Sequence, residues 1–110
     1  MGIYRELYFF YGMEIVEQNI KEYVKQKQLQ LAEDNDMYID LSEMLKGFLV
    51  LQTMSGNKYF LVAAKPEPCE EDKVYKLDPL TSGQSDDIKS LMYEFNVQGE
   101  IKPICIITNY

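Results

Sequence analysis

An α+β fold in one domain, residues 1–110, is predicted by the order of strand-like and helix-like segments along this chain. The first observation is a pair of apolar runs, Phe48–Met54 and Lys58–Ala64, joined by a short turn that contains Gly and Asn, as is typical of a β-hairpin. The second is a helical spacing of apolar residues on each side of this hairpin, and the third is a strand pattern near each end. We therefore expect a four-stranded antiparallel sheet with two helices on one face.

The first half of the chain contains an aromatic strand and an amphipathic helix. Residues Glu6–Ile15 are rich in Tyr and Phe, which favour strands, and Gly12 within them indicates a bulge or a close backbone approach. Residues Glu17–Leu31 form the predicted helix, which ends before a polar loop. The side chains expected on its apolar face are Val16, Ile20, Tyr23, Val24 and Leu31.

Two small elements are predicted as insertions around the hairpin. One short helical turn precedes it, capped by Asp40 or Ser42 and ended by Gly47. After the hairpin, prolines end its second strand, and residues Val74–Leu77 form a short edge strand.

The second half of the chain predicts a helix and a final strand. Ser85 is the expected N-cap, Gly99 lies beyond the end of the helix, and the apolar residues Ile88, Leu91, Met92 and Phe95 recur at helical spacing. Residues Ile104–Ile107 are apolar enough to favour a central position in the sheet. The complete order, strand, helix, hairpin, helix, strand, is that of a ferredoxin-like β-α-β-β-α-β sandwich with small insertions.

The composition argues against ordinary catalysis. The chain has no histidine, one arginine (Arg5) and two cysteines (Cys69 and Cys105). Histidine is the usual general acid or base and the commonest metal ligand, and arginine is the usual clamp for phosphate. Neither a glycine-rich phosphate loop nor a G-x-S-x-G sequence is present. We expect a protein that is not an enzyme and that holds no cofactor.

The cysteines and the acidic loop near residue 35 are expected to have structural roles. Both thiols are expected to be free, Cys105 buried within an apolar strand and Cys69 exposed in a loop. Asp34 and Asp36 are spaced like the start of a calcium loop, but Ile39 and Leu45 occupy the positions of its glycine and its bidentate glutamate. No metal site is expected.

The charge balance favours a protein partner. Asp and Glu number 18 against 11 Lys and Arg, which gives a formal net charge of −7. Such a field repels nucleic acids and anionic membranes and attracts basic surfaces, although it also serves solubility. The predicted partner-binding patch consists of Asp34, Asp36, Glu70, Glu71 and Asp72. Its binding should weaken with salt.

Ten lysines against one arginine, with abundant Ile, Tyr and Asn, suit an AT-rich coding genome. We expect a small phage or viral accessory protein that inhibits or redirects a host protein, with a low-GC bacterial protein as the alternative source. The opening residues lack a signal-peptide pattern, so a cytoplasmic location is expected, in the host cell if the protein is phage-encoded.

A second hypothesis uses the open face of the sheet. Aromatic residues on the first and third predicted strands could stack on bases or hold a small ligand, as in RNA recognition domains of this topology. The candidates are Tyr8, Phe10 and Tyr59, which should then be exposed on one face. The third strand lacks the basic, glycine-interleaved pattern of those domains, and the chain is acidic. Pairing of copies through an apolar strand edge is a further alternative.

Overall fold

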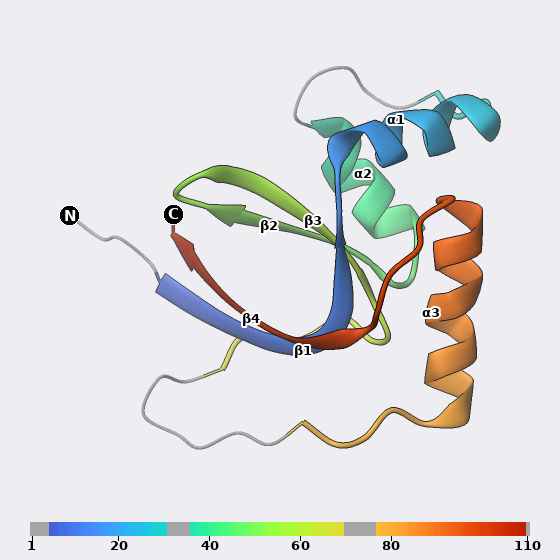
Figure 1. Cartoon of the computed structure of the whole chain (residues 1–110). Helices are drawn as coiled ribbons and strands as arrows, with labels where there is room; N and C mark the ends of the chain where they lie inside the picture. Colours follow the sequence, from blue (N-terminus) through green and yellow to red (C-terminus); the bar gives the residue numbers. More distant parts are fainter. Residues whose placement is uncertain (1–4, 31–35, 70–76, 110) are drawn as a thin grey trace.

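The structure, a computed structural model, describes residues 5–30, 36–69 and 77–109 (Figure 1). The elements in chain order are β1 (Arg5–Ile15), α1 (Glu17–Gln26), α2 (Asp36–Met44), β2 (Phe48–Thr53), β3 (Gly56–Val62), α3 (Ser82–Glu94) and β4 (Lys102–Asn109). The predicted α+β class and the four-stranded antiparallel sheet are confirmed. The described residues form three helices where two were expected, because α2 spans nine residues in place of one short turn.

Strand β1 links the two halves of the sheet, whose strand order is β2-β3-β1-β4. Its residues from Arg5 to Gly12 pair with β4, whereas its residues from Gly12 to Ile15 pair with β3, both in antiparallel register. The change of partner occurs at Gly12, where a Cβ atom would lie 2.5 Å from the Leu61 carbonyl oxygen. The predicted close backbone approach at Gly12 is therefore confirmed, and it explains why this position has no side chain.

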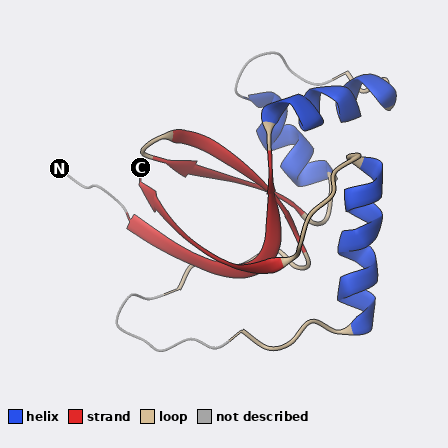
Figure 2. Ribbon diagram, viewed as in Figure 1, coloured by secondary structure: helices blue, strands red, loops and turns tan. Residues whose placement is uncertain are grey.

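The main core lies between the sheet and the helices, which gather on one side of the strands (Figure 2). Sheet residues such as Ile15, Phe48 and Leu61 contact apolar side chains from all three helices. The buried helical members are Ile20 and Tyr23 of α1, Tyr38 and Leu41 of α2, and Ile88 of α3, with Phe95 just after α3. Ring stacking of Tyr23 on Phe95, with centroids 4.2 Å apart, joins α1 to the end of α3.

A second core fills the other face of the sheet, because the sheet curls until its outer strands β2 and β4 contact each other (Figure 1). Phe10, Leu51, Phe60 and Val62 are buried there. The rings of Phe10 and Phe60 meet edge to face, with centroids 5.2 Å apart. This face is therefore the inside of a curled sheet, and it is not an open platform.

Helix α1 ends earlier than its apolar pattern predicted. It stops at Gln26, and Gln28 has a φ of 52°, which turns the chain away from the helix axis. The Leu29 amide then bonds back to the Val24 carbonyl. Val16 precedes the helix as its N-cap and is 63% exposed, so its predicted place on the apolar face is wrong. Leu31 lies outside the described residues.

Helix α3 begins four residues before the predicted start, since Thr81 rather than Ser85 is its N-cap. The Thr81 hydroxyl accepts a hydrogen bond from the Gln84 amide, and the Gln84 side chain accepts one from the Thr81 amide. This reciprocal capping box satisfies two amides that the first helical turn leaves without partners. The predicted apolar face is confirmed, with Ile88 and Phe95 buried.

Three predictions, one about the last strand and two about the cysteines, are wrong. Strand β4 is an outer strand and not a central one, and Cys105 on it is exposed. Cys105 is exposed because successive side chains of a strand point to opposite faces of the sheet. Ile104 and Ile106 pack into the curled sheet, whereas Cys105 and Ile107 face outward. Cys69, expected to be exposed, is half-buried beside β1, where its amide bonds to the Leu7 carbonyl. The edge strand predicted at 74–77 falls almost wholly outside the described residues.

Candidate functional site

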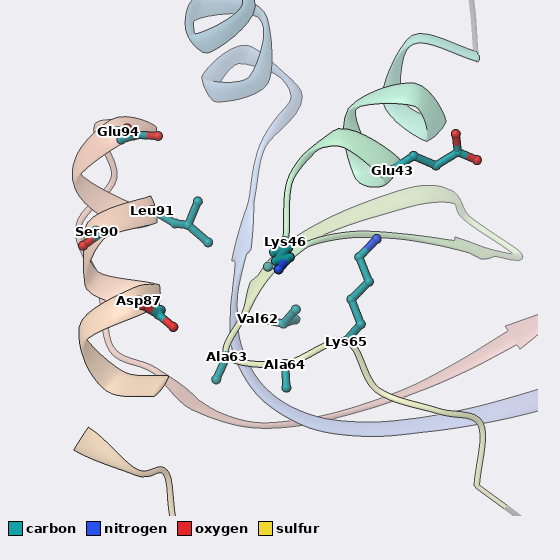
Figure 3. Close-up of a pocket in the computed structure, with 11 residues that line it drawn as sticks. Glu43, Lys46, Val62, Ala63, Ala64, Lys65, Asp87, Ser90, Leu91 and Glu94 are labelled. Atoms are coloured by element: carbon teal, nitrogen blue, oxygen red, sulfur yellow. The ribbon is translucent and has the colours of Figure 1, made fainter. Parts of the chain in front are cut away.

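An open cleft of about 670 Å³ lies between α3 and the end of α2 (Figure 3). Its floor is the segment that follows β3, where the small side chains of Ala63 and Ala64 fill little of the space between the walls. The α3 wall carries Asp87, Ser90, Leu91 and Glu94, and the opposite wall carries Glu43, Lys46 and Lys65. The volume suits a small ligand or one side chain of a partner.

Gly47 connects α2 to the sheet at the bottom of this cleft. Its φ of +96° is a conformation that residues with a Cβ rarely adopt, and its carbonyl accepts a hydrogen bond of 2.7 Å from the Val62 amide. Leu91 of α3 lies directly above it. A glycine at this position therefore lets α2, β3 and α3 meet closely, which sets the depth of the cleft.

The charged groups of the cleft differ in how far they are already paired. The Lys65 ammonium donates a hydrogen bond to the Ser42 carbonyl at the C-terminal end of α2, where a positive charge is favourable. Glu94 forms an ion pair with Lys27, just after α1, at 3.7 Å. Lys46 and Asp87 make no ion pair with any residue in the described ranges. Glu43 is likewise in no ion pair with a described residue, so the cleft presents one unpaired cation, Lys46, and two unpaired anions, Glu43 and Asp87.

The outward surface of α3 adjoins the cleft and carries an exposed aromatic residue. We define the α3 outer face as Asp86, Asp87, Lys89, Ser90, Tyr93 and Glu94. Tyr93 is 87% exposed, and it makes no hydrogen bond or ring contact with another described residue. The opposite side of α3 is fixed in the core through Ile88. The Tyr93 ring is therefore held out into solvent by a rigid helix.

A group of tyrosines beneath α1 and α2 has a structural role. The Tyr38 hydroxyl donates a hydrogen bond to Glu17 Oε1 at the start of α1. Burial, then this bond and the charge of Glu17, raise the pKa of Tyr38 above its usual value. Burial and the charge of Glu17 also raise the pKa of Tyr59, although its bond with Asn57 opposes the shift. These hydroxyls stay protonated at neutral pH, and the bond from Tyr38 holds α2 against α1.

The described residues offer little for metal binding. Among them, no group of three or more His, Cys, Asp or Glu side chains is placed to hold a metal ion. The cleft combines carboxylates, ammonium groups and one hydroxyl on an open surface. Such a set can form ion pairs and hydrogen bonds with a partner.

The predicted acidic patch falls almost entirely on residues that the structure does not describe. Asp34, Glu70, Glu71 and Asp72 lie outside the described residues. Asp36 is the first residue of α2, and its side chain is not described. The patch therefore stays a prediction.

The predicted aromatic platform on the sheet needs a correction. Phe10 is only 3% exposed, inside the curled sheet. Tyr8 is half-buried on the same face, where its hydroxyl bonds to Glu6 Oε2 at 2.8 Å. Tyr59 belongs to the helix-side core on the opposite face. These three rings do not share an exposed face, because the curl of the sheet closes one face and the helices cover the other.

The sequence analysis considered only the apolar face of this helix and did not identify the α3 outer face. The signal was nevertheless present: Ser90 has Asp86 and Asp87 four and three residues before it, and Tyr93 and Glu94 three and four residues after it. Residues at these spacings are neighbours on a helix surface. A helix drawn from the sequence would have placed all four around Ser90.

Comparisons with protein-family models, with curated proteins and with solved structures found no match to this chain. In the part of the chain that the structure describes, no helix is long and apolar enough to cross a membrane.

Proposed function

We propose that this protein is a small, non-enzymatic interaction module that binds a protein partner with a basic surface. The observation that carries the proposal is Tyr93, 87% exposed on a rigid helix and bordered by carboxylates. Tyrosine supplies a large, stiff contact surface at low conformational cost and is frequent among the residues that dominate binding energies. Surrounding negative charge steers a basic partner and excludes an acidic one.

The remaining acidic residues extend this proposal. The net charge of −7 gives the whole surface an attraction for basic partners, and Asp34, Asp36 and Glu70–Asp72 are the further contact residues we propose. The lysine-rich composition supports a phage or viral accessory protein that inhibits or redirects a host protein in the cytoplasm. For such a protein, the basic groove of a nucleic-acid enzyme would be a suitable target.

We also propose that the fold is a variant of the ferredoxin-like arrangement. In that arrangement the third strand lies between the first two, and the fourth strand pairs with the first. The order β2-β3-β1-β4 with antiparallel neighbours is consistent with this description. This chain differs from the ferredoxin-like arrangement in its additional helix α2 and in the closed curl of its sheet.

The experiment is a comparative pull-down from nuclease-treated lysate of the source cell or its host, at low and high salt. The test variant is Asp87→Lys/Glu94→Lys on the α3 outer face. The matched control, Glu22→Lys/Glu100→Lys, makes the same change in net charge at exposed positions elsewhere. The proposal expects one protein that wild type and control retain, and that the test variant or high salt releases. Equal retention by both variants would contradict a role for this face.

A further inference from the structure

Ser90 is the centre of the α3 outer face. Its small side chain is surrounded on the helix surface by Asp86, Asp87, Tyr93 and Glu94, at spacings of three and four residues. Ser90 and Glu94 line both the cleft and a second hollow of about 510 Å³ on the outer side of α3. The two hollows therefore form one continuous surface across the helix, and they meet at Ser90 and Glu94.

The Tyr93 ring borders this surface with a free aromatic face. A single exposed aromatic residue is common on protein surfaces and by itself indicates nothing. Here the ring lines the same hollow as two carboxylates, Asp86 and Glu94, and one ammonium group, Lys89. An aromatic face attracts cations through its quadrupole, and adjacent carboxylates attract the same cations through their charge. Both features therefore favour a positively charged occupant.

The charges around Ser90 are available to such an occupant. Asp86 and Asp87 make no ion pair with any residue in the described ranges. The ion pair between Glu94 and Lys27 is long, and both side chains are about half exposed, so a partner can replace it at little cost. Lys89 is the one cation within the face as defined. The face thus carries three carboxylates against one ammonium group.

We propose that the α3 outer face docks a basic segment of the partner protein through an arginine side chain, which stacks on Tyr93 and pairs with the carboxylates around Ser90. This inference rests on the proposed function and names the chemistry of the contact. Arginine fits better than lysine because its guanidinium is planar. It can stack on a ring and donate paired hydrogen bonds to a carboxylate at the same time, whereas an ammonium group acts as a compact, strongly hydrated charge.

The test uses two short Gly/Ser peptides of equal length and equal charge, one carrying three arginines and the other three lysines. Each is titrated into the ¹⁵N-labelled protein, and amide shifts locate the binding site. We expect the shifts to centre on residues 86–94, with the arginine peptide bound about threefold more tightly. Tyr93→Leu should abolish this preference, while Asp86→Asn/Asp87→Asn should weaken both peptides. The control Glu22→Gln/Glu100→Gln should match wild type, and the amide spectra verify that each variant is folded.

The outcomes separate this inference from the proposed function. A preference that persists in Tyr93→Leu, equal affinity of the two peptides, or shifts centred elsewhere would overturn the arginine contact. If the peptides bind equally but Asp87→Lys/Glu94→Lys still releases a captured protein, the interaction module stands and the arginine contact does not. If the arginine preference is seen at α3 but no protein depends on Asp87 and Glu94, the contact stands and the proposed function fails.

Discussion

Substitution of Gly47 by alanine tests how tightly α2, β3 and α3 meet beneath the cleft. A Cβ at this position would lie 2.9 Å from the Val62 carbonyl oxygen and 2.5 Å from Leu91 Cδ1. The Leu91 methyl can move, but the carbonyl belongs to the strand backbone. The φ of +96° adds a second cost, because residues with a Cβ avoid this conformation. We therefore expect Gly47→Ala to destabilise the protein through both strain and overlap.

A matched control in the hairpin separates the contribution of backbone strain from that of steric overlap. Gly56 has a φ of +111°, but no atom lies within 4 Å of the place that a Cβ would take there, so Gly56→Ala carries the backbone strain alone. That strain costs about 1–2 kcal/mol, and overpacking against fixed atoms adds about 1–3 kcal/mol. Gly47→Ala should therefore lower the free energy of unfolding by about 2–5 kcal/mol, and Gly56→Ala by about 1–2 kcal/mol.

Urea denaturation followed by circular dichroism gives both values by linear extrapolation. The difference between the two variants isolates the steric overlap at Gly47. Gly47→Ala should lower the free energy of unfolding by less in a Leu91→Ala background than in the wild type. In that background one of the two atoms that overlap the new Cβ has been removed. Equal destabilisation by Gly47→Ala and Gly56→Ala would refute the close approach of α3 and β3 described above.

Three further predictions concern the capping of α3, the interior of the sheet and alkaline pH. Thr81→Ala removes the capping box and should cost about 1 kcal/mol in a urea titration; a cost no larger than that of Ser82→Ala, the exposed neighbour, would argue against the cap. Phe10→Ala should cost about 3–5 kcal/mol because its ring fills the curled sheet, whereas a loss near zero would show that the ring is exposed. Above pH 10 the free energy of unfolding should fall, because Tyr38 ionises at its ordinary pKa of 10.0 in the unfolded chain but at a higher pKa in the folded one. Stability from this group is complete below pH 10 and is lost at about 1.4 kcal/mol per pH unit as the pH rises towards the folded-state pKa. Tyr38→Phe should show a shallower slope in urea titrations at several alkaline pH values, and an unchanged slope would contradict the assignment.

The elements that local patterns define were predicted well from the sequence. The hairpin of β2 and β3 follows from two apolar runs and a short turn, and the buried face of α3 follows from the spacing of Ile88 and Phe95. Gly12 was also interpreted correctly, since an isolated glycine in a strand often marks a close approach. Each of these predictions depends on residues near one another in the chain.

Most of the errors arose where distant segments decide the outcome. Hydropathy suggested that Ile104–Ile107 is central, but it measures how apolar a strand is and does not show which strands flank it. One error was local: the N-cap of α3 is Thr81 rather than Ser85, because the side chains of Thr81 and Gln84 cooperate in a capping box that a single N-cap preference overlooks. The curl that buries Phe10 depends on contact between β2 and β4, and no local pattern encodes that contact.

The candidate surface on α3 could also be predicted only in part from the sequence. The spacing of Asp86, Ser90 and Tyr93 could be read from the sequence as one helix face. Which side of α3 is buried also followed from the pattern. What the sequence could not show is the cleft beside that face, because its opposite wall comes from α2 and from the end of β3.

Strand β1 contributes to two cores at once, and this restricts how the chain can change length. Phe10 belongs to the core inside the curled sheet and Ile15 to the core beneath the helices, with Gly12 between them. Insertion of one residue within a strand exchanges the faces of every side chain beyond it. An insertion in β1 would therefore leave only one of the two cores correctly filled, whichever side of Gly12 received it. The connections between elements are the places where this protein can gain or lose residues, while β1 has a fixed length.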